Sequence, residues 1–369
     1  LLVGGGLANG LLASRLRIDR PELDFLVLEA GPTLGGNHTW SFHETDVRPD
    51  AMRWLVSLGA QRFSGGHDVI FQRHARTLRG DYASLRSHHF HAALHGQLGA
   101  RARLGARASE VGATHVVLDN GERLEARAVI DARALPPQWP SGSQNFLGQD
   151  LELAEPHGLA RPLLMDATVE QSDGFCFIYA LPWDERRVLV EDTHYANTPA
   201  LELEASRARI RRWVDARGWT IVNVEREEHA ALPIPLRGDA PQLARPMLGV
   251  SAGFFHATTG YSLPFAVTLA ERIAALENLD AEHLTTFLND AARSHWRRQR
   301  FFRLLNRMLF LGTSPHARER IFSAFYEHDE ALIARFYSGQ FTLPDMLSAL
   351  SRGAATVATL PALRAASAW

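Results

Sequence analysis

The sequence predicts a mixed α/β fold that begins with a Rossmann-type strand–helix–strand unit, contains an inserted β-rich domain and ends in helices. Three observations support this fold class. A glycine turn at Gly4–Gly6 joins an apolar strand to an apolar helix. Strand-like runs dominate residues 160–236, and helical periodicity dominates residues 264–352. The 369 residues suffice for two or three connected layers around a sizeable core.

Short strands are predicted along the N-terminal part of the chain. A second set lies between about 98 and 131, where Val116–Leu118 and Ala128–Ile130 follow one another around the turn Asp119–Gly121. The Asn-Gly pair within that turn adopts positive φ at low cost, which is typical of a hairpin. The first unit consists of a strand, a helix and a second strand, at Leu1–Val3, Leu7–Arg17 and Asp24–Glu29.

The middle of the chain predicts an antiparallel strand pair and one helix. Phe175–Leu181 and Arg187–Glu191 are expected to be neighbours across the turn Pro182–Glu185. A helix at Leu201–Arg217 interrupts the strands, and four of its arginines are expected to face solvent: Arg207, Arg209, Arg211 and Arg212.

Composition excludes several classes of protein. Hydrophobic residues make up 46% and charged residues 22% of the chain, as in ordinary globular proteins. The net charge of −2 argues against a nucleic-acid-binding protein. The single cysteine, Cys176, excludes an internal disulfide and a multi-cysteine metal site, and agrees with a reducing cytoplasm.

No stretch approaches the roughly 18 uncharged apolar residues that a spanning helix needs, and no signal peptide is recognisable. We therefore expect a cytoplasmic protein that does not cross a membrane. Because the sequence opens inside a predicted strand without a methionine, we also expect a few residues to precede Leu1.

The glycine turn is similar to a dinucleotide-binding fingerprint, in which small residues let a pyrophosphate approach the amides of a helix N-terminus. It departs from the fingerprint at the third glycine, where Asn9 stands and Gly10 follows. Glu29 ends the second strand, where a carboxylate accepts the hydroxyls of an adenosine ribose and repels a 2′-phosphate. The alternative is an ordinary tight turn before a helix. The predicted nucleotide contacts are Gly4, Gly5, Gly6, Leu7, Ala8, Asn9, Glu29 and Ala30.

Two later segments favour FAD over NAD. Val129–Arg133 and Gly253–Ser262 resemble the later flavin-contacting segments of the hydroxylase-like FAD proteins, a group that includes prenyl-lipid reductases. The alternative for the second segment is a loop that packs a helix. The predicted flavin contacts are Asp131, Ala132, Gly253, Thr259, Gly260 and Tyr261. We therefore assign residues 1–70, 98–150 and 241–290 to an FAD-binding domain, residues 151–240 to a β-rich substrate domain and residues 291–369 to a C-terminal helical region.

Seven blocks follow one another along the chain: Gly4–Leu11, Gly35–His43, Val129–Ala134, Val188–Tyr195, His229–Leu236, Ser251–Val267 and Phe301–Phe310. Together they resemble the bacterial lycopene β-cyclase family. The resemblance implies non-redox closure of the ψ ends of lycopene and related linear carotenoids to β-ionone rings. It also implies reduced FAD as the cofactor, NAD(P)H as its external reductant and peripheral association with the membrane surface.

The resemblance places an essential acid in the pair Glu191-Asp192. A carboxyl at the end of an apolar strand, beside another acid, is expected to have a raised pKa. Consecutive strand residues point to opposite faces, so only one of the two can face a cavity, and we choose Glu191. The alternative is that both acids are solvated or pair with arginines such as Arg186 and Arg187.

The remaining candidates are histidines, aromatic residues and one basic segment. His38, His43, His194 and His256 match no metal-ligand spacing, and we predict no metal. Trp40, Phe254, Phe255 and Tyr261 either line a polyene tunnel or fill the core. The basic amphipathic segment Trp296–Phe310 either lies in the membrane interface or packs on the core.

Two other functions stay open at this stage. The first is an FAD-dependent isoprenoid-lipid reductase or hydroxylase of the same fold. The second is a flavin-binding carotenoid carrier without catalysis.

Overall fold

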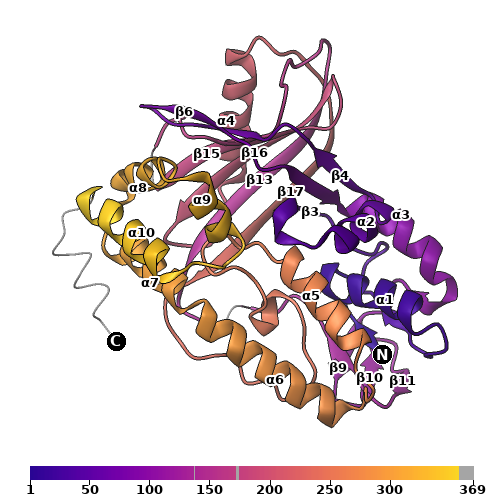
Figure 1. The fold of residues 1–369 in the computed structure, drawn as a ribbon. Helices are drawn as coiled ribbons and strands as arrows, with labels where there is room; N and C mark the ends of the chain where they lie inside the picture. The colour runs from indigo at the N-terminus through magenta and orange to yellow at the C-terminus, as the bar shows by residue number, and fades with distance from the viewer. Residues whose placement is uncertain (137, 172–173, 357–369) are drawn as a thin grey trace.

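The computed structural model describes residues 1–136, 138–171 and 174–356 (Figure 1). Its N-terminal unit is a parallel sheet in the order β12-β1-β2-β8, with helix α1 (Leu7–Asp19) between the first two strands in the chain. The predicted strand–helix–strand unit is therefore present. The four strands are short: β1 Leu2–Val3, β2 Val27–Leu28, β8 Ala102–Arg103 and β12 Ile130–Asp131.

The predicted hairpin has a different partner strand. Strand β10 (His115–Leu118) pairs with β11 (Arg123–Glu125) on one side and with β9 (Ala108–Val111) on the other. Residues 128–130 lead instead into β12, which lies parallel to β1. The sequence placed the turn correctly, but the short polar run Arg123–Glu125 carries too little apolar pattern to be recognised as a strand.

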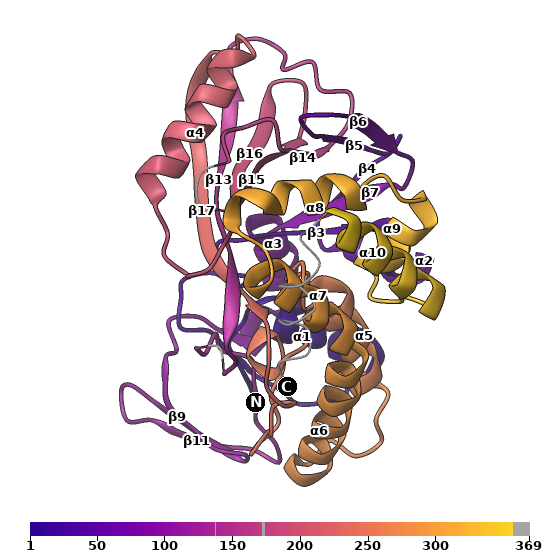
Figure 2. The same ribbon diagram turned by 90° about the vertical axis from the view of Figure 1, so that its left-hand side faces the viewer.

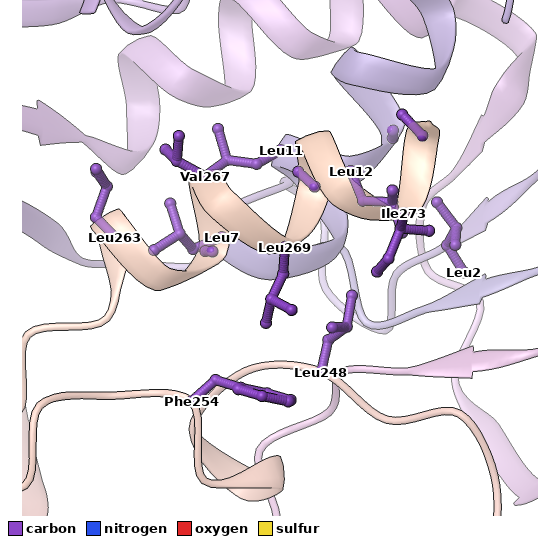
Figure 3. Packing of buried hydrophobic residues seen from close by; sticks show 14 of the residues in the cluster. Leu2, Leu7, Leu11, Leu12, Leu248, Phe254, Leu263, Val267, Leu269 and Ile273 are labelled. Carbon is purple, nitrogen blue, oxygen red and sulfur yellow. The ribbon is translucent and has the colours of Figure 1, made fainter. Parts of the chain in front are cut away.

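Helix α5 (Leu263–Ala274) packs along α1, although the two are far apart in the chain. Figure 3 shows their apolar side chains meeting, with Leu7 and Leu11 of α1 near Leu263 and Val267 of α5. Phe254 also lies in this cluster. This core joins residues from both ends of the chain and holds the N-terminal turn against the later segment around residue 250.

A larger mixed sheet forms the second part of the molecule, in the order β17-β13-β16-β15-β14-β5-β6. Its neighbouring strands pair antiparallel, except that β14 and β5 pair parallel. The expected neighbours β15 and β16 pair antiparallel, as predicted. The first strand of the inserted part begins at Ser141, so the domain boundary expected between residues 150 and 151 falls within β13. Two strands from before residue 80 also join this sheet. Its strands are β5 His67–Ile70, β6 Ala75–Leu78, β13 Ser141–Leu153, β14 Leu163–Asp166, β15 Phe175–Pro182, β16 Arg187–Ala196 and β17 Ile221–Pro235.

A small sheet links the two parts. Strand β7 (Tyr82–Arg86) pairs with β3 (Thr39–His43) and with β4 (Ala60–Phe63). Helices α2 (Pro49–Ser57) and α3 (Ser87–Leu98) accompany it. Short 3-10 turns occur at Glu44–Asp46, Gly99–Arg101, Val250–Ala252 and Pro315–Ala317.

Helices cover both faces of the large sheet. Helix α4 (Leu203–Ala216) lies on one face, and the C-terminal helices lie on the other (Figure 2). The predicted helical character of residues 264–352 is present, whereas residues 357–369 of the assigned C-terminal region lie outside the described residues. The remaining helices are α6 Ala281–Arg298, α7 Arg300–Leu311, α8 Arg318–Phe325, α9 Glu330–Tyr337 and α10 Leu343–Thr356.

Segment Trp296–Phe310 packs on the core. The guanidinium of Arg303 is turned inward, 4.1 Å from the ring centroid of Trp296, and donates to the Trp296 carbonyl at 2.7 Å. Arg307 donates to the carbonyl of Leu236 at 3.0 Å. The apolar side of α7 is therefore buried rather than free for a bilayer. In the described part of the chain, none of the helices has the combined length and apolar character needed to span a membrane.

The sequence analysis expected four arginines of α4 to face solvent, and this expectation is wrong for two of them. Arg209 turns toward the sheet and pairs with Asp192, and Arg207 pairs with Glu227. Arg211 remains exposed and pairs with Asp215 one turn further along the helix. The partners of Arg209 and Arg207 are charged residues of the strands, and the sequence pattern of the helix does not reveal them.

Candidate active site and nucleotide-binding turn

The N-terminal glycine turn leaves open space beside the first turn of α1. Gly4 has φ +86°, and a Cβ there would lie 3.1 Å from the backbone of Ala132, so the chain just after β12 packs closely against it. A Cβ on Gly6, by contrast, would meet no atom within 4 Å. Free amides at a helix N-terminus beside open space are what a pyrophosphate requires. The turn therefore fits the phosphates of a dinucleotide.

Glu29 is held in place next to this turn. Its Oε2 accepts a hydrogen bond from the Gly5 amide at 2.7 Å, and its Oε1 accepts one from the Gly31 amide at 2.7 Å. The exposed Ala30 follows it. The carboxylate is thus fixed at the end of β2, where the sequence analysis expected a ribose to bind.

Other predicted nucleotide contacts have structural partners. Leu7 belongs to the apolar core between α1 and α5. Asn9 is fully buried, and its Nδ2 donates to the carbonyls of Val3 at 3.0 Å and Ile130 at 3.2 Å. Asn9 thereby ties α1 to β1 and β12, which explains an asparagine where the fingerprint has glycine. Ala8 is half-buried, near Gly249.

Asp131 is also committed to partners within the chain. Its carboxylate is completely buried and forms ion pairs with Arg133 at 3.0 Å and Arg245 at 2.7 Å. Burial opposes ionisation, but the hydrogen bonds from these two arginines hold the pKa of Asp131 below its ordinary value. Ala132 lies with its backbone against Gly4. We conclude that Asp131 fixes the β12 end of the nucleotide-binding unit.

The segment before α5 divides between core and cavity. Gly253 ends a short 3-10 turn with φ +80° and faces Pro241 and Trp139. Thr259, Gly260 and Tyr261 instead line a large internal cavity. Gly260 has φ +72°, and a Cβ there would lie 2.9 Å from Leu232, so a side chain at this position would crowd the cavity wall.

The cavity lies between the large sheet and its C-terminal helical cover. Strands β13 to β17 contribute one wall, α7 to α10 contribute the opposite wall, and the segments 38–41 and 258–263 close the side toward the N-terminal unit. Most of the lining is apolar or aromatic, with residues such as Phe146, Phe177, Leu309, Phe322 and Phe336. Such a lining suits a hydrocarbon ligand.

Glu191 brings a carboxyl into this apolar cavity. It lies on β16 between the cavity residues Leu189 and Thr193, and the Thr193 hydroxyl donates to its Oε1 at 2.7 Å. Burial, followed by the negative charge of Glu228, raises the pKa of Glu191 to about 8. Glu191 is therefore protonated at neutral pH and can donate a proton.

Asp192 lies on the other face of the same strand. Arg209 of α4 binds it with two parallel hydrogen bonds, of 2.9 Å from Nε and 2.8 Å from Nη2. Asp192 is 1% exposed and is absent from the cavity lining. The alternation of strand side chains thus separates the two acids, and an ion pair with α4 holds Asp192.

Several tyrosine hydroxyls lie in the cavity wall, and the sequence analysis did not identify all of them. Tyr179 donates to the Ser41 hydroxyl at 2.8 Å, and the Tyr82 and Tyr261 hydroxyls are 2.6 Å apart. Burial raises the pKa values of Tyr82, Tyr179 and Tyr261, so all three are neutral. Tyr179 is the direct cross-strand neighbour of Glu191, a pairing that only the register of β15 and β16 reveals.

The remaining candidates fall into two groups. Trp40 and His38 line the cavity, and burial lowers the pKa of His38 to about 4, so its ring is neutral. Phe254 and Phe255 are core residues instead. Among the described residues, no cluster of three or more His, Cys, Asp or Glu side chains is arranged to hold a metal ion.

Comparison with known proteins gives a consistent result. A family model described as Lycopene cyclase protein matches residues 1–364. The chain is 46% identical to a lycopene beta-cyclase of Pseudescherichia vulneris, with 94% of this chain and 91% of that protein covered. It is 42% identical to a lycopene beta-cyclase of Pantoea ananas, with 99% and 97% covered.

A solved structure of a probable FAD-dependent monooxygenase from Pseudomonas aeruginosa has a similar fold. Its TM-score is 0.55 at 15% identity, and the match covers 95% of this chain and 98% of that chain. At this identity the likeness concerns the fold alone. It confirms the predicted fold class.

Proposed function

The chain belongs to the lycopene cyclase family, and from this membership we propose that it is a lycopene β-cyclase whose acid is Glu191. The observation that carries the site assignment is the Glu191 carboxyl in a largely apolar cavity, where burial raises its pKa to about 8. The substrate is lycopene or a related linear carotenoid, and each reacting ψ end becomes a β-ionone ring.

The chemistry is an isomerisation through a carbocation. Glu191 donates its proton to C2 of the terminal double bond, which leaves a tertiary cation at C1. The C5=C6 bond attacks C1 and closes the ring, and loss of the proton at C6 completes the product. The Glu191 carboxylate formed in the first step is a base in the same cavity, and by taking this proton it returns to its starting state.

The cavity has two further tasks in this mechanism. Water must be kept away from the cation, and the apolar wall formed by the sheet and the helices α7 to α10 provides this exclusion. Aromatic faces attract positive charge, and rings such as Trp40 and Tyr179 line the cavity. The neutral ring of His38 avoids adding positive charge near the cation.

FAD is the cofactor that the N-terminal unit fits. The open space beside Gly6 and the amides of α1 would hold its pyrophosphate, and Glu29 would hold its ribose. The segment just before helix α5 lines the cavity with Thr259, Gly260 and Tyr261. This segment therefore connects the N-terminal unit to the cavity. Reduced FAD would supply negative charge that favours the cation, with NAD(P)H as the external reductant.

Access from a membrane surface accompanies this function, because a C40 hydrocarbon is nearly insoluble in water. Leu343 and Leu347 of α10 are 74% and 70% exposed, and Ala349 of the same helix lines the cavity. An apolar helix surface next to the substrate cavity suits the uptake of a lipid-dissolved substrate by a peripherally bound protein.

Product analysis tests the function. The FAD-loaded protein, given lycopene in vesicles and NADPH, is expected to form cyclic products of unchanged mass. NADPH oxidation should not rise in proportion to product, because ring closure leaves the oxidation state unchanged. Products that gain hydrogen would instead identify a reductase, and products that gain oxygen a hydroxylase. Unchanged lycopene bound to the protein would identify a carrier.

A second prediction concerns the cofactor. Gly6→Val is expected to weaken FAD binding at least tenfold, because a branched side chain would fill the space that the pyrophosphate needs. The fold should tolerate the change, since no atom lies within 4 Å of a Cβ at Gly6. The matched control is Gly96→Val at an exposed glycine of α3 whose Cβ also meets open space. Equal FAD affinity of the two variants would place the pyrophosphate elsewhere.

A further inference from the structure

A second buried glutamate lies in the same row of the sheet as Glu191. Gly148 of β13 is the cross-strand partner of Glu191 on one side and of Glu228 on the other. Residues paired in this way share one face of a sheet, so both carboxyls rise on the cavity side. Gly148 has no side chain to separate them.

The Glu191 carboxyl leans over this glycine. A Cβ on Gly148 would lie 3.5 Å from Oε2 of Glu191 and 3.2 Å from Leu189. Any larger residue would therefore compete with Glu191 for this space. Glycine at this position lets Glu191 extend toward β17, the strand that carries Glu228.

Glu228 itself is 1% exposed and does not line the cavity. Its Oε2 accepts a hydrogen bond from Arg226 at 2.8 Å, whereas no described residue donates to its buried Oε1. Arg226 also binds Asp150 of β13 through Nε at 2.8 Å. Glu228 is therefore a buried carboxyl whose charged hydrogen-bond partner is Arg226.

We propose that Glu228 is a positioning residue whose carboxylate, held by Arg226, keeps the neighbouring Glu191 protonated between catalytic cycles. This inference rests on the proposed function of Glu191 as the acid. Two carboxyls in one buried site are difficult to ionise together, so the acid that has an arginine partner ionises first and the other keeps its proton.

The surrounding charges agree with this order of ionisation. After burial, the charge of Glu228 is the largest effect that raises the pKa of Glu191, followed among the charges by Asp192 and opposed by Arg226. Burial also raises the pKa of Glu228, to about 7, while Arg226 and Thr39 of β3 lower it and Asp150 raises it. On the neighbouring strand β15, Tyr179 is neutral.

The test is the pH profile of cyclisation in Glu228→Gln. The amide removes the negative charge and can still accept from Arg226. Activity needs protonated Glu191, so it falls as the pH rises through the Glu191 pKa, and this alkaline limb should move down by about one pH unit in the variant. Activity at pH 6 should be nearly unchanged, whereas at pH 8 it should drop several-fold.

Two variants act as controls. Glu227→Gln changes the preceding residue, which points to the opposite face and pairs with Arg207 and Gln149, and its alkaline limb should stay at the wild-type pH. Glu228→Asp keeps the charge and should restore most of the wild-type profile. An alkaline limb in Glu228→Gln within 0.3 units of wild type, or a uniform loss of activity at all pH values, would overturn the inference.

An infrared titration of the carboxyl bands separates this inference from the proposed function. The protonated-carboxyl band that disappears in Glu191→Gln should titrate at lower pH in Glu228→Gln than in wild type. A midpoint that does not move refutes the pairing, whatever the activity. Absence of cyclic product from wild type, with a shifted midpoint, would refute the cyclase function and leave the carboxyl pair supported.

Discussion

Glu191→Gln is expected to lower cyclisation by roughly a hundredfold or more, the range lost when a general acid is removed. The amide keeps the volume of the side chain and can still accept the hydrogen bond from Thr193, but it has no proton to give. Thermal stability and the flavin spectrum should stay close to wild type. Steady-state product formation from lycopene, measured by chromatography, gives the result.

Asp192→Asn is the neighbouring control for this prediction. Asp192 faces α4 rather than the cavity, so its loss should weaken the ion pair with Arg209 and lower stability more than the intrinsic rate of ring closure. An inactive, well-folded Asp192→Asn protein beside an active Glu191→Gln protein would reverse the two roles. If both variants kept full activity, the proton would come from another group.

The N-terminal unit was predictable because it depends on local features. These features are the glycine turn, the apolar strand before it and Glu29 after the second strand, and all lie within about thirty residues. Each has a known role in the nucleotide-binding strand–helix–strand unit. The roles of Asn9 and Asp131 were not predictable in the same way. Their hydrogen bonds join segments more than a hundred residues apart, and a motif does not show that a polar side chain is already engaged.

The choice between Glu191 and Asp192 followed from the two-residue period of a strand and from the family resemblance. The two-residue period assigns Glu191 and Asp192 to opposite faces of the sheet, but it does not show which element packs on each face. Arg209 was expected to face solvent, yet it covers the α4 face and binds Asp192. Glu228 was missed for a related reason. Its position beside Glu191 depends on the register of three strands, with Gly148 between the two acids, and register is a tertiary property.

The helical cover of the cavity was predictable as helix but not as a cavity wall. Apolar periodicity marks residues that must be buried, and a substrate cavity and a packed core use the same residues. Phe254, Phe255 and Trp40 illustrate this limit, since two of them fill the core and one faces the cavity. The basic amphipathic pattern of α7 gave a similar ambiguity, which the inward hydrogen bonds of Arg303 and Arg307 resolve.

Arg318 links helix α8 to the large sheet and to α7, and its replacement should lower the free energy of unfolding strongly. This arginine is fully buried at the start of α8 and donates to the carbonyl of Tyr195 at 2.9 Å and to that of Leu309 at 3.2 Å. It also donates to the side-chain oxygen of Asn197 and lies 4.6 Å from the ring centroid of Phe310. Burial lowers its pKa to about 10, so it remains charged at neutral pH.

Arg318→Met keeps the apolar contact with Phe310 but leaves these oxygens without their donor. Each unsatisfied buried acceptor costs about 1 to 3 kcal/mol, so the free energy of unfolding should fall by roughly 3 kcal/mol or more. Because α8 supplies Ile321 and Phe322 to the cavity wall, cyclisation should fall strongly while FAD binding at the remote glycine turn persists. Arg320→Met on the exposed side of the same helix is the matched control. Denaturant unfolding, FAD titration and product formation for both variants test the prediction, and equal stability of the two would show that Arg318 does not hold the cover in place.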